Sequence, residues 1–185
     1  MPAGTPSPVR VLAISGSLRR ASSNGAILRA AIELAPAGVV VELYDGLATL
    51  PHFNPDLDRT LDDPLLPSPV RALRAAIGSA HALLISSPEY AHGVPGSLKN
   101  ALDWLVGGSE IVDKPVALWN TAPHATHAQA SLAETLRTMS VRLVAEADLS
   151  LSLGGRDHAQ VAADPALAAR LVHALDALRR AAASP

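Results

Sequence analysis

The sequence has no cysteine among its 185 residues, and only 3% of the residues are aromatic. The absence of cysteine excludes a disulfide framework, a thiol nucleophile, a thiolate zinc site and an iron–sulfur cluster. A chain of this length fits one domain and buries a full core without such crosslinks. Alanine, leucine and valine supply most of the apolar 49%, as expected for alanine-rich helices packed on aliphatic strands.

Strong charge of either sign is also missing. Lysine and arginine together number 15 against 17 for aspartate and glutamate, so the formal net charge is -2 with neutral histidines. Nucleic-acid binding requires a broad basic surface. We therefore expect small-molecule or protein partners and no nucleic acid.

Long hydrophobic runs are absent too. The apolar stretch at 11–14 is far too short for a signal peptide or a membrane segment, and the Pro/Gly/Ser-rich start has no basic lead-in. We expect a cytoplasmic protein without a membrane partner. Residues 1–8 are expected to form a flexible N-terminal tail, followed by one domain over residues 9–182.

Short aliphatic runs alternate with segments of helical periodicity along this domain. Residues 48–64 are the exception, because they have no periodicity and are rich in Pro, Asp and Asn, which is typical of a long ordered loop. Apolar spacing of three and four residues predicts helices around residues 27–35, 70–77, 98–105, 132–139 and 168–175. Strands are expected at residues 9–15, 39–44, 81–86, 116–120 and 142–153.

This alternation predicts the α/β fold class. Each right-handed crossover between parallel strands needs a helix, so the helices cover both faces of a parallel sheet. We expect a flavodoxin-like three-layer sandwich with a five-stranded parallel sheet of order 2-1-3-4-5. In that order the connections that follow the first and third strands run in opposite directions. This opens a ligand-binding crevice at the carboxyl ends of the two strands.

The loop after the first strand suits an anion. It reads Ser-Gly-Ser-Leu-Arg-Arg-Ala-Ser-Ser-Asn over residues 15–24 and ends where a helix is expected to begin. Hydroxyls, backbone N–H groups, the helix terminus and Arg19 can converge there on a phosphate. A hydroxyl-rich helix cap followed by surface arginines explains the same residues. Neither G-x-x-x-x-G-K-[ST] nor G-x-G-x-x-G occurs here, which excludes a P-loop and a Rossmann fingerprint.

The loop after the third strand suits a planar ring. It reads Ser-Ser-Pro-Glu-Tyr-Ala-His-Gly-Val-Pro-Gly over residues 86–96, and its prolines and glycines fix its path. Backbone N–H groups and Tyr90 can meet the edge and face of a ring. The alternative is a stiff turn whose tyrosine packs on a neighbour. Together the two loops flank the expected crevice, one suited to phosphate and one to a ring, as a mononucleotide requires.

Both loops resemble those of the NADPH-dependent FMN reductase family, which includes quinone, chromate and azo-dye reductases. The first motif is Gly-Ser-Leu-Arg at 16–19 with Ser22 and Asn24. The second is Pro-Glu-Tyr at 88–90 with Pro-Gly-x-Leu-Lys-Asn-Ala-x-Asp-Trp at 95–104. The resemblance continues in order from about residue 9 to residue 144 and includes Lys-Pro-Val-Ala at 114–117.

The resemblance implies an oxidoreductase with FMN as cofactor and NADPH or NADH as reductant. Quinones, free flavin, azo compounds or other small oxidants would be its acceptors, and it would form a homodimer or homotetramer. Hydride chemistry belongs to the flavin, so no catalytic side chain is expected. The implied phosphate contacts are Ser17, Arg19, Ser22, Ser23 and Asn24, and the implied isoalloxazine contacts are Pro88, Glu89, Tyr90, Ala91 and Asn120.

Two departures from the family pattern affect this implied site. Ala91 stands where the family usually has asparagine, and residues 120–127, Asn-Thr-Ala-Pro-His-Ala-Thr-His, replace a glycine-rich loop. A bulkier loop would narrow the acceptor pocket, alter the flavin potential or weaken FMN binding.

A non-enzymatic electron carrier and a flavin-free binding module are alternatives, because fold does not fix function, although carriers commonly have an acidic docking face that this chain lacks. A hydrolase lacks the G-x-S-x-G elbow. His124 and His127 have no clear third ligand, so no metal is expected. Trp104 and Trp119 are expected to pack in the core.

Overall fold

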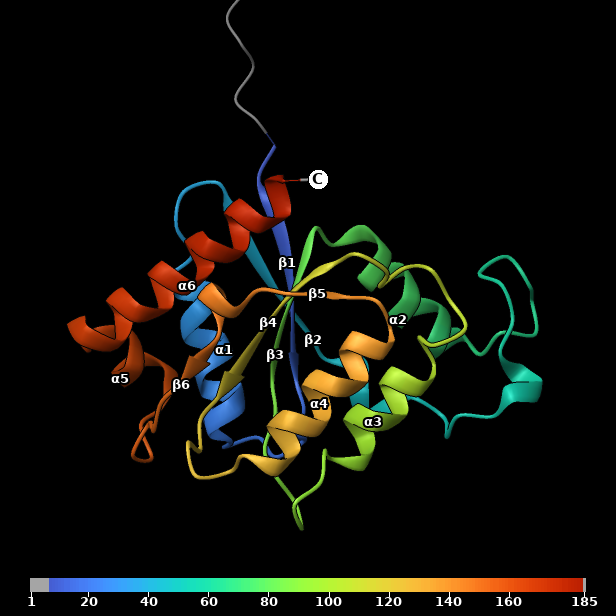
Figure 1. Ribbon diagram of the computed structural model, residues 1–185, viewed down its shortest axis with the longest axis horizontal. Coiled ribbons are helices and arrows are strands. Elements are labelled where there is room, and N and C mark those ends of the chain that lie inside the picture. The colour runs from blue at the N-terminus through green and yellow to red at the C-terminus, as the bar shows by residue number, and fades with distance from the viewer. Residues whose placement is uncertain (1–6, 185) are drawn as a thin grey trace, which may run out of the picture.

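Parallel strands form the centre of the protein, which is described here by a computed structural model covering residues 7–184. The sheet has the order β2-β1-β3-β4-β5, with β6 also pairing with β4 (Figure 1), which confirms the expected order. Most of the expected tail at 1–8 lies outside the described residues. The strands are β1 (Val9–Ser15), β2 (Val39–Tyr44), β3 (Ala82–Ser86), β4 (Pro115–Asn120), β5 (Arg142–Leu143) and β6 (Leu149–Ser150).

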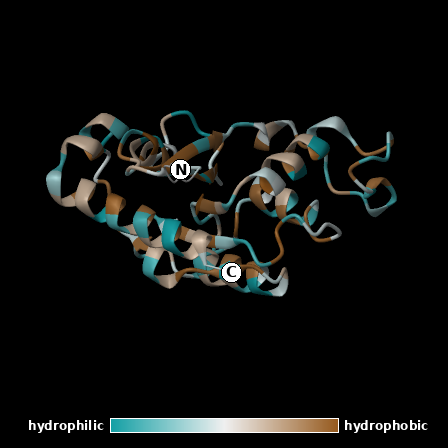
Figure 2. Ribbon diagram, turned by 90° about the horizontal axis from the view of Figure 1, so that it is seen from above, coloured by the Kyte–Doolittle hydropathy of each residue, from teal (hydrophilic) through white to brown (hydrophobic). Residues whose placement is uncertain are grey.

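Helices cover both faces of the sheet. Figure 1 shows α1, α5 and α6 on one side and α2, α3 and α4 on the other. Brown and teal bands along the helices in Figure 2 show their amphipathic character. None of the helices within residues 7–184 is both long and apolar enough to cross a membrane. They are α1 (Ser23–Glu33), α2 (Ser68–Ser79), α3 (Gly96–Asp103), α4 (His127–Thr138), α5 (His158–Ala163) and α6 (Pro165–Ala183).

Two hydrophobic cores lie on the two faces of the sheet. Successive side chains of a strand point to opposite faces, so Val11 and Ala13 of β1 join the core under α1 and α6. Leu12 and Ile14 join the core under α2, α3 and α4. Every residue of β3 is buried, as expected for a central strand with helices on both faces.

The fifth strand is shorter than its sequence predicts. We expected one strand over residues 142–153, but a short 3-10 turn at Ala145–Ala147 separates β5 from β6. Immediately after that turn, the Asp148 carboxylate accepts a hydrogen bond from the backbone N–H of Leu118 at 2.6 Å. A side chain therefore takes the place of a strand carbonyl at the middle of β4, and the outer edge of the sheet is interrupted there.

Two helices also differ from expectation. Helix α4 begins at His127, five residues before the expected 132–139 segment. Helix α5 was not expected, although Asp157 and Gln160 form a capping box at its start. Both helices begin at the end of the molecule where the strand carboxyl termini lie.

Helix α3 holds the first part of the long loop at 48–64. Asn100 accepts a hydrogen bond from Phe53 N at 2.8 Å and donates one to the carbonyl of Pro51 at 2.9 Å. Trp104 donates to the same carbonyl at 2.8 Å, and its ring meets Phe53 edge-on with centroids 5.1 Å apart. The Asn and Trp of the second sequence motif therefore fix the path of this loop.

Helix α2 holds the second part of the loop through a buried arginine. Arg74 is only 2% exposed. Its guanidinium donates to Asp58 Oδ1 at 2.9 Å, to the carbonyl of Trp104 at 3.0 Å and to the carbonyl of Arg59 at 2.7 Å. One side chain thus ties the loop to both α2 and the end of α3, and the loop is ordered as expected.

Candidate functional site

The ends of β1 and β3 meet closely at the carboxyl edge of the sheet. Gly16 N donates to the carbonyl of Ser86 at 2.8 Å. A Cβ atom at position 16 would lie 2.8 Å from the Ser87 hydroxyl and 3.1 Å from a methyl group of Leu98. A larger residue at position 16 would require Ser87 to shift. The backbone hydrogen bond holds the loops after β1 and β3 side by side.

The loop after β1 presents hydroxyls and arginines around the N-terminus of α1. Ser22 is the N-cap, and its hydroxyl accepts a hydrogen bond from Gly25 N at 2.9 Å. Ser17 accepts one from Arg19 N at 3.4 Å. Arg19 and Arg20 are exposed, while Ser22 and Ser23 are half-buried. The expected capping role is confirmed, and the loop also has the polar groups that an anion requires.

Asn24 connects all three loops at this edge. Its side chain is 5% exposed. Its Oδ1 accepts hydrogen bonds from Ser86 Oγ at 2.8 Å and from Thr121 Oγ1 at 3.3 Å. These contacts give Asn24 a structural role between β3 and β4, in addition to the phosphate contact that the sequence predicts.

The loop after β3 ends in a tight hairpin. Tyr90 and Gly93 exchange backbone hydrogen bonds at 3.1 Å and 2.9 Å. Between them Ala91 and His92 have φ angles of 49° and 61°, the pattern of a type I′ turn. Asparagine tolerates this left-handed conformation better than alanine does, which explains physically why the usual family residue suits position 91. Tyr90 is 57% exposed.

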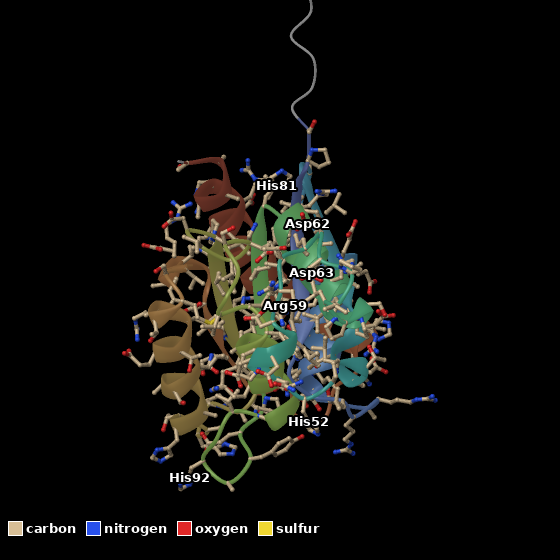
Figure 3. The ribbon with its side chains drawn as sticks, turned by 90° about the vertical axis from the view of Figure 1, so that its right-hand side faces the viewer. His52, Arg59, Asp62, Asp63, His81 and His92 are labelled. Carbon is tan, nitrogen blue, oxygen red and sulfur yellow. The ribbon has the colours of Figure 1, made fainter. Side chains whose placement is uncertain are left out.

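Side chains join this hairpin to the start of α4. Glu89 Oε2 accepts a hydrogen bond from Ala128 N at 2.8 Å and so caps α4. The imidazoles of His92 and His127 stack with centroids 4.2 Å apart. In Figure 3, His92 lies at the same end of the protein as His52, whereas His81, which precedes β3, lies at the other end. The expected ring contacts Pro88, Glu89, Tyr90 and Ala91 therefore belong to one braced loop.

The third loop is closed by Asn120. Its Nδ2 donates to the carbonyl of Ala125 at 3.0 Å, and its Oδ1 accepts from Ala122 N at 2.8 Å. The side chain is 6% exposed, so both of its polar atoms are used inside the turn. Asn120 lies at the carboxyl edge as expected, but the structure gives it a turn-forming role.

Beside the third loop lies a cavity of about 490 Å³ whose lining includes Asn120, Gln129 and Asp148. Desolvation raises the pKa of Asp148 to about 6. The hydrogen bond from Leu118 N opposes this rise, and the nearby Glu146 carboxylate adds to it. Asp148 is a half-solvated acid that titrates well above the usual aspartate range.

We expect the stabilising contribution of the Asp148 carboxyl to be lost as the pH rises from about 4 to about 6. In this window the folded chain binds more protons than the unfolded chain, whose aspartate ionises near about pH 3.9. Asp148→Asn keeps an oxygen for Leu118 N–H but does not titrate. Denaturant unfolding across this range should give a flatter pH dependence for the variant than for the wild type or for Glu146→Gln. Identical slopes would contradict the assignment.

Both tryptophans are buried, whereas His124 and His127 are exposed. Trp104 and Trp119 are 0% and 1% exposed, which confirms that they pack in the core. His127 is the first residue of α4 and His124 lies before it. Within residues 7–184, no group of three or more histidine, aspartate or glutamate side chains is arranged to hold a metal ion.

Part of the surroundings of the loop after β1 was not predicted from the sequence. A cavity of about 450 Å³ beside this loop is lined by Arg19 and Arg20, and also by Arg29 of α1 and Arg156 of the turn before α5. Arg29 lies four residues after Gly25, and residues four apart are neighbours on a helix surface. This spacing was a local signal that Arg29 reaches the first turn of α1. No local signal links Arg156 to the loop, because more than a hundred residues separate them.

The fold and the site together define a class of protein. A parallel sheet of order 2-1-3-4-5, with a loop rich in hydroxyls and arginines at the point where the strand order reverses, is the architecture of a flavodoxin-like domain. The model of the NADPH-dependent FMN reductase family matches residues 9–155. The chain belongs to this family.

Several known proteins are similar to this chain. A probable NADPH:quinone oxidoreductase 2 from Oryza sativa is 44% identical over 103 residues, which are 54% of this chain and 49% of that protein. A quinone reductase from Escherichia coli is 37% identical over 109 residues, or 59% and 55% of the two chains. The chain thus matches about half the length of these relatives.

A solved structure is similar over almost the whole chain. The flavoenzyme NAD(P)H:(acceptor) oxidoreductase FerB from Paracoccus denitrificans has a TM-score of 0.74 at 26% identity, and the match covers 93% of this chain and 98% of that one. The azoreductase AzrA has a TM-score of 0.56 at 18% identity and supports the fold alone.

Proposed function

We propose that the protein is an FMN-containing oxidoreductase that uses NADPH or NADH to reduce quinones, free flavin or other small acceptors. The observation that carries the proposal is the juxtaposition of the two loops after β1 and β3 in a chain of this family. Gly16 brings them within backbone hydrogen-bonding distance at the switch point of the sheet. One loop offers groups for a phosphate, and the other offers groups for a ring.

The residues of the first loop fit the flavin phosphate. Ser17 and Ser22 offer hydroxyls, α1 offers its free N-terminal N–H groups, and Arg19 offers a positive charge that is exposed to solvent. Ser23 and Asn24 form the first turn of the same helix. A phosphate dianion bound there would receive charge-assisted hydrogen bonds from a preformed loop.

The residues of the second loop fit the isoalloxazine ring. FMN, when bound, supplies hydride transfer between reductant and acceptor. The chain supplies position: Pro88 and the Tyr90–Gly93 hairpin form a rigid wall, and Tyr90 is exposed for stacking. Glu89 braces this wall against α4. These groups orient the ring and shield part of it from water.

We also propose that the protein acts in the cytoplasm, where its reductant is available, as a homodimer. The apolar residues Leu98 and Leu102 of α3 are buried in the protein's own core and are not available for a partner. Apolar side chains that are free for a partner follow this helix, where Val106 is 65% exposed and Val112 is 45% exposed. The outer surface beside α3 is therefore the proposed contact.

Titration of purified protein with FMN tests the proposed function. We expect a yellow complex with about one FMN per chain, quenched flavin fluorescence, and steady-state NAD(P)H oxidation when a compact quinone is added. Tight FMN binding without NAD(P)H oxidation would favour an electron carrier. Failure to bind FMN, with tight binding of FAD or a nucleoside triphosphate, would overturn the cofactor assignment.

A further inference from the structure

Four arginines surround the cavity beside the loop after β1. This cavity, which we call the arginine pocket, lies between that loop, the outer side of α1 and the turn that precedes α5, and its volume is about 450 Å³. Arg19 and Arg20 come from the loop, Arg29 comes from α1, and Arg156 comes from the turn. All four are exposed to solvent.

The side chains of Arg29 and Arg156 each lie next to a glycine, Gly25 and Gly154 respectively. A Cβ atom at Gly25 would lie 3.1 Å from Nη1 of Arg29 and 3.3 Å from the Ser22 hydroxyl. The Arg29 guanidinium therefore lies back along α1, next to the N-cap. On the opposite wall, a Cβ atom at Gly154 would lie 3.5 Å from Nη1 of Arg156.

The turn that carries Arg156 is fixed by its backbone. Gly154 and Gly155 have φ angles of 59° and 81°, which favour glycine. Nη1 of Arg156 donates to the carbonyl of Leu153 at 3.1 Å, and the turn leads directly into the capping box of α5. The second wall of the pocket is therefore part of the fold, and a ligand does not need to order it.

The chain itself balances only part of the positive charge in the pocket. Among the described residues, none of the four arginines has a carboxylate oxygen within 4.0 Å of its guanidinium nitrogens. The ion pairs among these residues are formed by other arginines and by a lysine. The lining also contains one carboxylate, Asp157, whose Oδ1 accepts from Gln160 N at 2.9 Å, so one negative charge stands against the four arginines. Guanidinium groups stay charged at all ordinary pH values. The pocket therefore favours an anion.

The flavin phosphate alone does not account for this charge. Under the proposed function, that phosphate occupies Ser17, Arg19 and the N-terminus of α1, which leaves Arg20, Arg29 and Arg156 for another anion. Arg156 also lies just beyond residues 9–155, the segment that the family model matches. The other reactant of the proposed reaction, the reduced dinucleotide, carries further phosphates.

We propose that the arginine pocket binds a phosphate group of the nicotinamide dinucleotide, next to the flavin phosphate. This inference rests on the proposed function. The phosphate is either the 2′-phosphate that distinguishes NADPH from NADH or the pyrophosphate that both carry, and arginine suits either because its planar donors match phosphate oxygens. Arg29 and Arg156 hold it from the two walls.

The test uses FMN-loaded protein whose flavin content is measured first by absorbance. Calorimetric titration with 2′,5′-ADP and with ADP is compared for wild type, Arg29→Gln, Arg156→Gln and the control Arg180→Gln, which removes an equal charge from the end of α6. Each pocket variant should bind 2′,5′-ADP about tenfold to a hundredfold more weakly, the effect of one charge-assisted hydrogen bond. The control should match wild type, and all four proteins should hold equal FMN.

The pattern of losses identifies the phosphate. Weakened 2′,5′-ADP with unchanged ADP supports the 2′-phosphate, and weakening of both ligands supports the pyrophosphate. The inference is overturned if FMN-loaded wild type binds neither ligand, if the pocket variants bind them as wild type does, or if those variants lose FMN instead. Failure of the proposed function is a separate result, since it appears as wild-type protein that takes up no FMN before any titration.

Discussion

Replacing Arg74 with methionine should lower the free energy of unfolding by about 3–5 kcal/mol. The change leaves the Asp58 carboxylate without its partner and removes donors from the carbonyls of Arg59 and Trp104. Loss of one member of a buried, hydrogen-bonded ion pair is among the few mechanisms that give effects of this size. Urea unfolding followed by circular dichroism measures the change, and limited proteolysis should show earlier cleavage within residues 48–64.

A second ion pair provides the control for this experiment. Arg137 and Glu134 on α4 are 3.3 Å apart, and both side chains are more than half exposed, at 61% and 74%. Arg137→Met should therefore change stability by less than about 1 kcal/mol. Adding Asp58→Asn to Arg74→Met should recover part of the loss, because the stranded charge is removed. Equal effects of Arg74→Met and Arg137→Met would show that burial does not control the contribution of Arg74.

Replacing Arg19 with alanine should weaken FMN binding by roughly tenfold to a hundredfold. A hydrogen bond to a charged group contributes about 1.5–3 kcal/mol, which corresponds to this range. Arg19 is exposed, and within residues 7–184 its guanidinium makes no hydrogen bond, so folding should be unaffected. Flavin fluorescence quenching measures the affinity of the apoprotein for FMN.

Riboflavin is the matched ligand for this variant, since it has the same ring without the phosphate. Its affinity should be nearly the same for Arg19→Ala and wild type. Equal loss of both ligands would show that Arg19 acts through the structure of the loop, and unchanged FMN affinity would place the phosphate elsewhere.

The central part of the fold could be predicted because its signals are local. Strands β1, β2, β3 and β4 are aliphatic runs with distinct ends, and the helices between them have clear apolar stripes. The outer edge could not be predicted in the same way. Residues 142–153 have the composition of a strand, but the contact between Asp148 and Leu118 interrupts it, and this contact joins residues thirty positions apart.

Helix ends and side-chain roles show the same limit. The start of α4 depends on Glu89, which caps the helix from another loop and leaves no signal near His127. The start of α5 did have a local signal in Asp157 and Gln160. Motif residues were placed correctly at the carboxyl edge, but the structure was needed to show that Asn24 and Asn120 use their side-chain oxygens in contacts between and within loops.

The interrupted outer edge also affects how the protein avoids aggregation. An open edge strand offers a row of unpaired N–H and C=O groups to which another chain can add a strand. Here β5 and β6 are two residues each and are separated by a 3-10 turn, so this edge is too short and too irregular to act as such a template. At the opposite edge, β2 runs six residues and exposes Glu42 beside the apolar Val40. The charge of Glu42 protects the β2 edge, whereas the short, interrupted strands protect the edge formed by β5 and β6. Variants that straighten residues 145–148 should therefore aggregate during refolding.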